Sequence, residues 1–201
     1  MKKILLDVDN VICFTSYLPY INKFMNANYQ IDDFTECFID KVAIPQEQFD
    51  EFIAFIRERN LYDKAEILPM AIETIQKLNE LYDIYICSSC VNPFDVEGSG
   101  VLFLHKYNYL IRILPFIHPG KYIFTNAKNI IRADVQIDDI LSNLKGNIKT
   151  KILFPSYHNK TISDEELKKY GVIRAGYDWR NGWSEVEDIL LKDEPKKRVY
   201  F

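Results

Sequence analysis

Carboxylate side chains stand at the ends of two short apolar runs in this sequence. Asp7 and Asp9 close the first run of the chain, and Asp138 and Asp139 close a later one. Two such pairs in one crevice would repel each other severely unless an opposite charge lay between them. Mg²⁺ suits oxygen ligands of this kind, because it takes one or two carboxylates, keeps several waters and shares its remaining positions with a substrate phosphate. The pattern therefore predicts a Mg²⁺ site made of these four aspartates.

Two serines and a lysine could hold a phosphate group beside that metal. Ser88 and Ser89 follow the apolar run 83–87, and Lys128 lies shortly before the second aspartate pair. Hydroxyl and ammonium groups donate hydrogen bonds to phosphate oxygens. Other interpretations stay open, because serines often only begin helices, a lone lysine is usually solvated and a pair of aspartates can cap a helix.

The elements that carry these residues alternate between apolar runs and helical patterns. The runs expected to form buried strands are 3–8, 83–87, 122–125, 135–137 and 151–154. Helices are expected from Pro69, over about 102–114, after Ser163 and over 183–191. This alternation predicts an α/β fold with a doubly wound parallel sheet, a Rossmann-type core. In such a sheet the ligand crevice lies outside the carboxyl ends of the strands, which is where the polar residues stand.

The segment after the first strand has a different pattern. From Tyr17 to about Asn60 apolar residues recur at helical spacing, and no convincing strand interrupts them. We therefore expect a small helical insertion at 17–62, within a core made of 1–16 and 63–201.

Composition limits the classes of function. With 201 residues and 48% apolar residues the chain can bury a sizeable core, and its length suits one domain with an insertion. The net charge of −4 offers no summed positive field for a nucleic-acid polymer, although one basic pocket could still hold a small anion. Asp7 and Asp9 break the first apolar run, which argues against a signal peptide or a membrane span and for a cytoplasmic protein. The basic run 196–198 is expected to be a solvated tail.

The four cysteines are expected to be reduced. Cys13, Cys37, Cys87 and Cys90 lie mostly in apolar surroundings, and a chain of this length needs no disulfide to build a core. The C-x-x-C formed by Cys87 and Cys90 could serve redox chemistry or zinc. However, Cys87 ends a buried run, and no second ligand pair with zinc spacing accompanies it.

Four motifs together resemble those of the haloacid dehalogenase superfamily of phosphatases. In chain order they are Asp7-Val8-Asp9-Asn10-Val11, Ser88, Lys128 and Asp138-Asp139. Within that superfamily the chain resembles the cytosolic and mitochondrial 5′(3′)-deoxyribonucleotidases. That likeness is carried by the segment 82–89, the interval from Lys128 to Asp139, the turn 157–159 and Asp178-Trp179. It covers most of the chain and is weakest in the insertion.

The resemblance implies a role for each site residue. Asp7 would be the nucleophile that forms an aspartyl-phosphate, and Asp9 the general acid and then base, with a pKa above that of metal-bound Asp7. Asp9 would also offer its backbone carbonyl to Mg²⁺. Ser88 and Lys128 would hold the phosphoryl oxygens, and the second aspartate pair would complete the metal site. The substrate would be a small phosphate monoester, expected to be a deoxyribonucleoside 5′(3′)-monophosphate.

Two alternatives to this activity stay open. One is a phosphatase of the same kind that acts on a sugar phosphate or another small phosphoester, and the other is a non-catalytic nucleotide-binding protein on the same scaffold. The sequence also leaves open the base preference, the choice between 5′ and 3′ phosphates, which of the paired aspartates binds Mg²⁺ directly, and a homodimeric state.

The insertion resembles the cap domain that closes over the active site in one branch of this superfamily. Aromatic residues could stack the base there, although each could equally be core packing. The candidates are Phe14, Phe34, Phe38 and Tyr62. Two positions depart from the family pattern: Asn10 stands where glycine is usual, and Asn126 stands where the nucleotidases usually carry an arginine. Asn tolerates left-handed backbone geometry, so the first change should do little damage, whereas the second could alter phosphate affinity.

Overall fold

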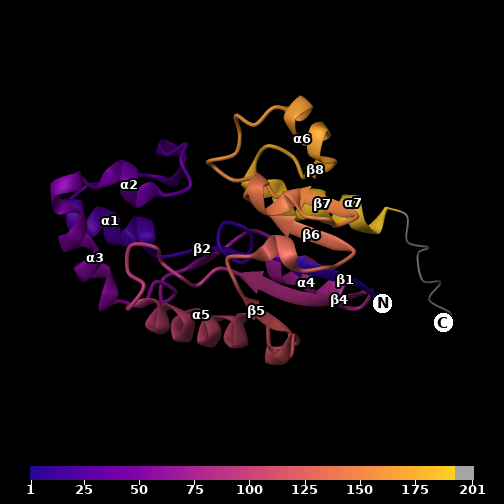
Figure 1. The fold of residues 1–201 in the computed structure, drawn as a ribbon, viewed down its shortest axis with the longest axis horizontal. Helices are drawn as coiled ribbons and strands as arrows, with labels where there is room; N and C mark the ends of the chain where they lie inside the picture. Colours follow the sequence, from indigo (N-terminus) through magenta and orange to yellow (C-terminus); the bar gives the residue numbers. More distant parts are fainter. Residues whose placement is uncertain (193–201) are drawn as a thin grey trace.

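A six-stranded parallel sheet forms the centre of the protein, which is represented by a computed structural model that describes residues 1–192 (Figure 1). The strand order is β5-β4-β1-β6-β7-β8. The strands are β1 (Lys2–Leu6), β4 (Tyr82–Ser88), β5 (Tyr122–Phe124), β6 (Val135–Asp138), β7 (Thr150–Leu153) and β8 (Val172–Arg174). The predicted α/β fold with a parallel sheet is confirmed. The basic run 196–198 lies outside the described residues.

The first strand lies between two neighbours that carry site residues. Leu6 of β1 is in register with Ile86 of β4 and with Ile137 of β6. The residues that follow β1, β4 and β6 therefore meet at one edge, because the carboxyl ends of parallel strands face the same way. Ile4, Leu5 and Leu6 are almost fully buried, so this strand is buried on both faces as its apolar run predicts.

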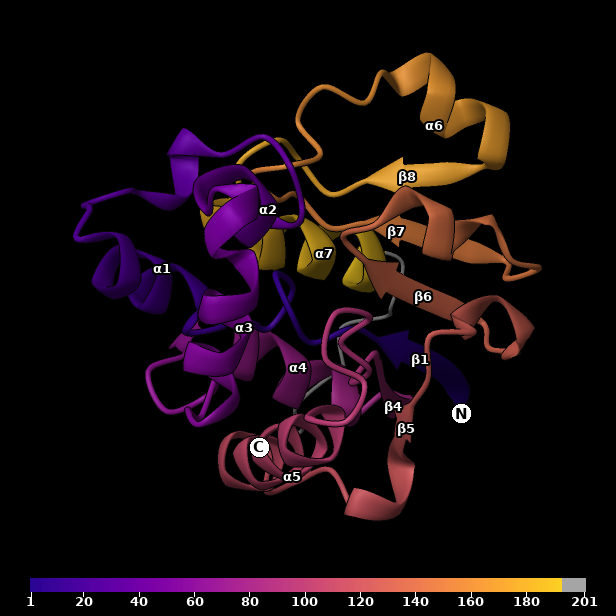
Figure 2. The same cartoon turned by 60° about the vertical axis from the view of Figure 1, so that its left-hand side comes forward.

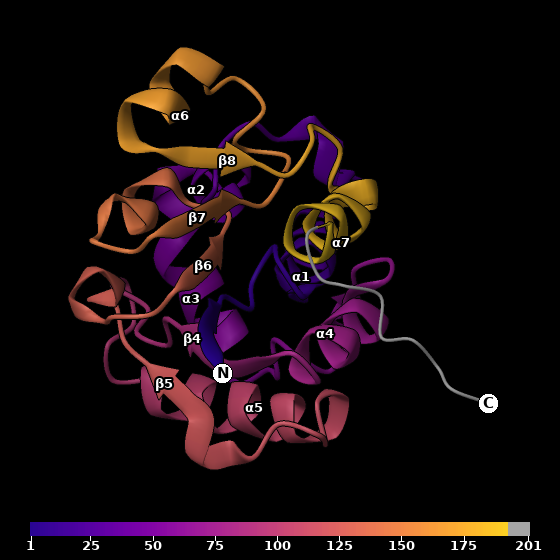
Figure 3. The same ribbon diagram turned by 90° about the vertical axis from the view of Figure 1, so that its right-hand side faces the viewer.

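Helices cover the two faces of the sheet unequally. Helices α4 (Ala71–Asn79) and α7 (Gly182–Leu191) cover one face, where the main core lies (Figure 3). The other face carries a small cluster of Leu5, Cys87 and Ile148. Helix α5 (Ser99–Ile113) packs beside β5, and the rings of Phe103 and Phe124 lie 5.1 Å apart.

The insertion forms a separate group of helices beyond the carboxyl edge of the sheet (Figures 1 and 2). It contains α1 (Tyr17–Met25), η1 (Ile31–Asp33), α2 (Ile39–Ala43), η2 (Gln46–Gln48) and α3 (Phe49–Arg57). Phe24 packs with Phe52 and Phe55, at 5.4 Å between ring centroids in each case. An antiparallel ribbon of β2 (Cys13–Phe14) and β3 (Glu66–Ile67) joins the insertion to the core.

Three short strands of the structure were not predicted from the sequence. Strands β2, β3 and β8 contain only two or three residues each, which is too short for a periodic pattern to stand out in the sequence. The predicted start of α6 (Asp164–Tyr170) is confirmed, since Ser163 Oγ accepts a hydrogen bond from the Glu166 backbone N–H at 3.2 Å. Among the described helices none is both long and apolar enough to cross a membrane.

All four cysteines are free thiols, as expected. Burial raises the pKa of Cys87 and of Cys90 to about 11, so both thiols hold their protons at neutral pH. Within residues 1–192, no cluster with the spacing of a metal site includes either of them. The redox and zinc interpretations of the C-x-x-C therefore find no support in the structure.

Gly182, at the start of α7, offers a test of how tightly this helix packs on the sheet. A Cβ atom at Gly182 would lie 2.5 Å from Phe154 Cζ, whereas a Cβ at Gly100 in α5 would meet no atom within 4 Å. Gly182→Ala should therefore lower the free energy of unfolding by about 1 to 3 kcal/mol through overpacking. Gly100→Ala should leave it unchanged or raise it by up to about 1 kcal/mol. Urea unfolding of both variants checks this, and equal stability of the two would contradict the packing.

Candidate active site

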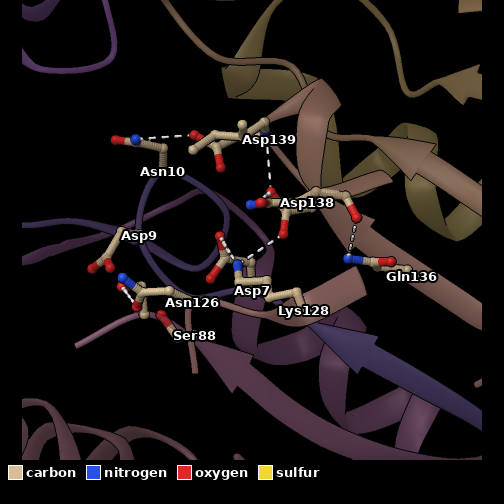
Figure 4. A network of polar contacts seen from close by, with 12 residues as sticks. Asp7, Asp9, Asn10, Ser88, Asn126, Lys128, Gln136, Asp138 and Asp139 are labelled. Carbon is tan, nitrogen blue, oxygen red and sulfur yellow. Dashed lines mark hydrogen bonds and ion pairs between the residues drawn. The ribbon is translucent and has the colours of Figure 1, made fainter. Parts of the chain in front are cut away.

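A tight turn after β1 carries the first motif. The N–H groups of Ile12 and Cys13 donate to the Val8 carbonyl, at 2.8 and 3.2 Å. Asn10 has φ of 59°, in the left-handed region that asparagine adopts more readily than other residues with a side chain, so it can take the place of the glycine expected here. The Asn10 side chain also makes a contact across the site, because its Nδ2 donates a hydrogen bond to Asp139 Oδ2 at 3.0 Å (Figure 4). Asn10 thus supports the turn and links the first motif to the last.

Lys128 lies between the two buried aspartates Asp7 and Asp138 (Figure 4). Its Nζ atom is 2.8 Å from an oxygen of each. Burial alone would lower the pKa of Lys128, but the charges of the two aspartates outweigh it and hold the pKa above its ordinary value. The side chain predicted to bind phosphate is therefore charged and also fixes the orientation of Asp7.

The carboxylate of Asp7 remains incompletely compensated. Its Oδ1 atom is buried and has no hydrogen-bond partner, while Oδ2 is paired with Lys128. Burial raises the pKa of Asp7 to about 6, against the opposing effect of Lys128 and with the help of the neighbouring Asp138 charge. An unpaired, buried carboxylate oxygen is costly, and a cation bound to it would remove that cost.

Asp9 turns toward a different set of partners. Its Oδ1 accepts a hydrogen bond from the Tyr62 hydroxyl at 2.6 Å, and its Oδ2 is 2.7 Å from Lys106 Nζ. Lys106 also donates to Ser88 Oγ at 2.9 Å and to the Ser89 carbonyl. This lysine, from α5, thus joins the first motif to the second.

Lys106 is a site residue that the sequence analysis missed. It is 1% exposed, and burial, the largest single effect, lowers its pKa, but the charge and hydrogen bond of Asp9, with smaller contributions from Cys90 and Asp7, together raise the pKa above its ordinary value. A lysine in a helical pattern is normally solvated. One sequence feature could have indicated that Lys106 is buried: Tyr109 and Leu110 follow it by three and four residues, which puts it on the apolar face of its helix.

The last motif presents its two aspartates differently. Asp138 Oδ2 pairs with Lys128 Nζ. Its Oδ1 accepts hydrogen bonds from the Ile140 N–H and from Asn143 Nδ2, at 3.0 and 2.9 Å. Asp139 Oδ2 lies 2.7 Å from His158 Nε2. Carboxylate oxygens of Asp7, Asp138 and Asp139 all lie within 4.8 Å of one another, as a metal site requires. The Asp9 side chain is not in that group.

The two serines of the second motif occupy different environments. Ser88 is fully buried at the end of β4, and its Oγ accepts a hydrogen bond from Lys106 Nζ. Ser89 directs its hydroxyl to the Asn126 side chain. Both serines and Asn126 line the cavity described below, so all three can meet an entering phosphate.

A cavity of about 630 Å³ lies between the sheet edge and the insertion, and Asp7, Asp9 and Lys128 are in its wall. Of the four aromatic candidates, Phe14, Phe38 and Tyr62 also line it. Phe38 is 53% exposed, and Tyr62 is buried with its hydroxyl on Asp9. Phe34 is 4% exposed, packs on Tyr29 and does not line the cavity.

Comparison with known proteins places the chain in a family. Residues 1–194 match the family model described as 5′ nucleotidase, deoxy (Pyrimidine), cytosolic type C protein. A putative 5′(3′)-deoxyribonucleotidase of Staphylococcus aureus strain MSSA476 is 32% identical over 141 residues, which are 70% of this chain and 68% of that protein. A 5′(3′)-deoxyribonucleotidase of Bacillus subtilis strain 168 is 26% identical over 95% of this chain and 100% of its own.

A solved haloacid dehalogenase-like hydrolase from Streptococcus pneumoniae aligns with a TM-score of 0.46 and 14% identity, over 87% of this chain and 92% of its own. The family model covers nearly the whole chain and includes every motif residue described above. The chain is therefore a phosphoric monoester hydrolase, and it belongs to the cytosolic type C family of 5′ nucleotidases.

Proposed function

We propose that this enzyme is a Mg²⁺-dependent phosphatase of deoxyribonucleoside 5′(3′)-monophosphates that works through an aspartyl-phosphate. The observation that carries the proposal is the buried, unpaired Oδ1 of Asp7, within the aspartate cluster and in the wall of a cavity roomy enough for a nucleotide. The Bacillus subtilis relative named 5′(3′)-deoxyribonucleotidase and the Staphylococcus aureus relative named putative 5′(3′)-deoxyribonucleotidase support the substrate class.

The aspartate cluster fits a magnesium ion. Asp7, Asp138 and Asp139 offer hard oxygen ligands, and Asp7 Oδ1 is free to bind. The Asp9 backbone carbonyl would add a further oxygen ligand. Bound there, Mg²⁺ would supply Lewis-acid stabilisation of the charge on the phosphoryl oxygens.

Asp7 and Asp9 divide the chemistry between them. Asp7 attacks phosphorus, so that a bond forms between its carboxylate and phosphorus while the bond to the ribose oxygen breaks. Asp9 gives its proton to that leaving oxygen. Water then attacks the aspartyl-phosphate and loses a proton to Asp9, which releases phosphate and restores both aspartates.

The two buried lysines and the serines position these groups. Lys128 holds the Asp7 carboxylate at 2.8 Å, and Lys106 holds Asp9 and the Ser88 hydroxyl. Their charges also lower the cost of bringing a phosphate dianion beside the carboxylates. Ser88 and Ser89 would donate to the phosphoryl oxygens.

The helices of the insertion would act as a cap. We take residues 17–62 as a cap that keeps bulk water from the site and admits only the water that attacks the aspartyl-phosphate, and 1–16 with 63–201 as the catalytic core. Phe14, Phe38 and Tyr17 give the cavity flat apolar surfaces. Such surfaces suit a nucleobase better than a bare sugar, which favours a nucleotide over the sugar-phosphate alternative.

Asp7→Asn tests the nucleophile. The amide can neither attack phosphorus as an anion nor give Mg²⁺ a charged oxygen, so phosphate release should fall by orders of magnitude. Measurement of phosphate released from dUMP and dTMP, with thermal unfolding to show that the fold survives, checks this. A variant that kept a tenth of the rate would exclude Asp7 as the nucleophile.

Asp9→Asn tests the proton transfer. The amide keeps the shape but cannot carry the proton, so hydrolysis should slow more for poor leaving groups such as nucleoside oxygens than for activated aryl phosphates. The ratio of kcat values on dUMP and on an aryl phosphate measures this difference. An equal loss on both substrates would count against the role.

Phe38→Ala tests base stacking. Phe38 is half exposed in the cavity, so its removal should cost binding energy and little stability. A stacking contribution of about 1 to 3 kcal/mol would lower kcat/KM for the nucleotide about 5- to 150-fold, with the aryl phosphate hydrolysed almost as before. Val42→Ala is the control, because Val42 is exposed on α2, the helix that Phe38 precedes, and does not line the cavity. Equal loss on both substrates would make Phe38 a packing residue.

A further inference from the structure

Three side chains of different chemistry meet where the insertion contacts the core. They are Cys37 of the insertion, Asp139 at the end of β6 and His158 in the loop between β7 and α6. One ligand atom of each, a sulfur, an oxygen and a nitrogen, lies within 4.8 Å of the others. The closest pair, His158 Nε2 and Asp139 Oδ2, is 2.7 Å apart.

The local structure already holds the three backbones in place. The Tyr157 hydroxyl donates to the Cys37 carbonyl at 3.0 Å, which ties the insertion to the loop that carries His158. Asn159 Nδ2 donates to the carbonyls of Asp139 and Phe154, at 2.8 Å each. The ligand atoms therefore need only side-chain adjustments of about an ångström to surround an ion, since bonds to zinc are about 2.0 to 2.3 Å long.

We propose that Cys37, Asp139 and His158 form a second metal site, for a thiophilic divalent cation such as Zn²⁺. A set of one sulfur, one nitrogen and one oxygen ligand matches tetrahedral zinc, with water from the cavity in the fourth position. Mg²⁺ does not select thiolates, so this site differs in chemistry from the cluster of Asp7, Asp138 and Asp139 and shares only Asp139 with it. Cys37 and Asp139 both line the cavity, so an ion can reach them.

Binding at this site would inhibit the enzyme. Burial raises the pKa of the Cys37 thiol, so the thiol carries its proton until the metal binds and then releases it to water. The ion would join Cys37 of the insertion to Asp139 and His158 of the core, and would so oppose movement of the insertion away from the active site. It would also take up an oxygen of Asp139, which belongs to the magnesium cluster.

Cobalt absorption tests the site without any need for catalysis. Co²⁺ is added to the full-length protein, wild type and Cys37→Ser, with Mg²⁺ in excess to fill the oxygen cluster. The wild type should show the near-ultraviolet band of cobalt–thiolate charge transfer, and Zn²⁺ should remove it by displacement. Cys37→Ser should lack the band, and His158→Gln should bind Co²⁺ about tenfold or more weakly.

Cys90→Ser is the matched control, since Cys90 also lines the cavity but stands in no cluster with histidine among the described residues. It should keep the band. A band that survives Cys37→Ser, or no band in the wild type, would overturn the proposal.

Phosphate release from an aryl phosphate at saturating Mg²⁺ tests the inhibition. Zn²⁺ should inhibit the wild type and Cys90→Ser at concentrations about tenfold or more below those needed for Cys37→Ser. Equal inhibition of all three would place the zinc in the oxygen cluster and overturn the proposed inhibition. If no variant or wild type released phosphate, the proposed function would fail, whereas the cobalt result would still decide the metal site.

Discussion

The structure depends on an excess of buried negative charge at the carboxyl edge of one sheet. Three carboxylates, those of Asp7, Asp138 and Asp139, lie together, and Lys128 brings a single full positive charge among them. Burial of unmatched charge costs several kcal/mol per ion, and the raised pKa of Asp7 reflects that cost. A folded chain would not keep this arrangement for stability alone. This excess of negative charge supports the proposal that the edge binds a cation and, through it, a phosphate.

Lys128 and Lys106 give the neighbouring aspartates Asp7 and Asp9 different surroundings. Asp7 and Asp9 are two residues apart, yet Asp7 pairs with Lys128 and Asp9 with Lys106 and Tyr62. Asp7 lies in the cluster with Asp138 and Asp139, whereas Asp9 faces Lys106 of α5 and Tyr62 of the insertion. These different surroundings fit the proposed division of roles, in which Asp7 would bind the metal and attack phosphorus and Asp9 would exchange a proton with the leaving group.

Sequence reasoning succeeded where local pattern decides the structure. Buried strands such as β1 and β4 are apolar runs that end in polar residues, so topology predicted their places and the meeting of Asp7 with Asp138. The place of Lys128 between them was predicted from its spacing to Asp138 and from the family resemblance. It failed for Lys106, because only a long-range contact with Asp9 shows what a helical lysine does. Phe34 and Phe38 look alike in sequence, but one enters the core and the other the cavity.

Two ion pairs and a shared apolar core join the insertion to the sheet. Arg57 pairs with Asp95 at 2.7 Å, and Asp32 pairs with Arg180 at 2.6 Å. Asp32 and Arg180 are each more than 40% exposed at the side chain, and an exposed ion pair contributes about 1 kcal/mol or less. The pair of Arg57 and Asp95 is partly buried, because the Asp95 side chain is 8% exposed and accepts two hydrogen bonds from Arg57. Ile21 and Phe52 of the insertion are fully buried in the main core, so apolar packing fixes the position of the insertion more than these ion pairs do. In the proposed mechanism, the insertion held in this position would keep bulk water from Asp7 and Lys128 in the cavity wall while the phosphoryl group is transferred.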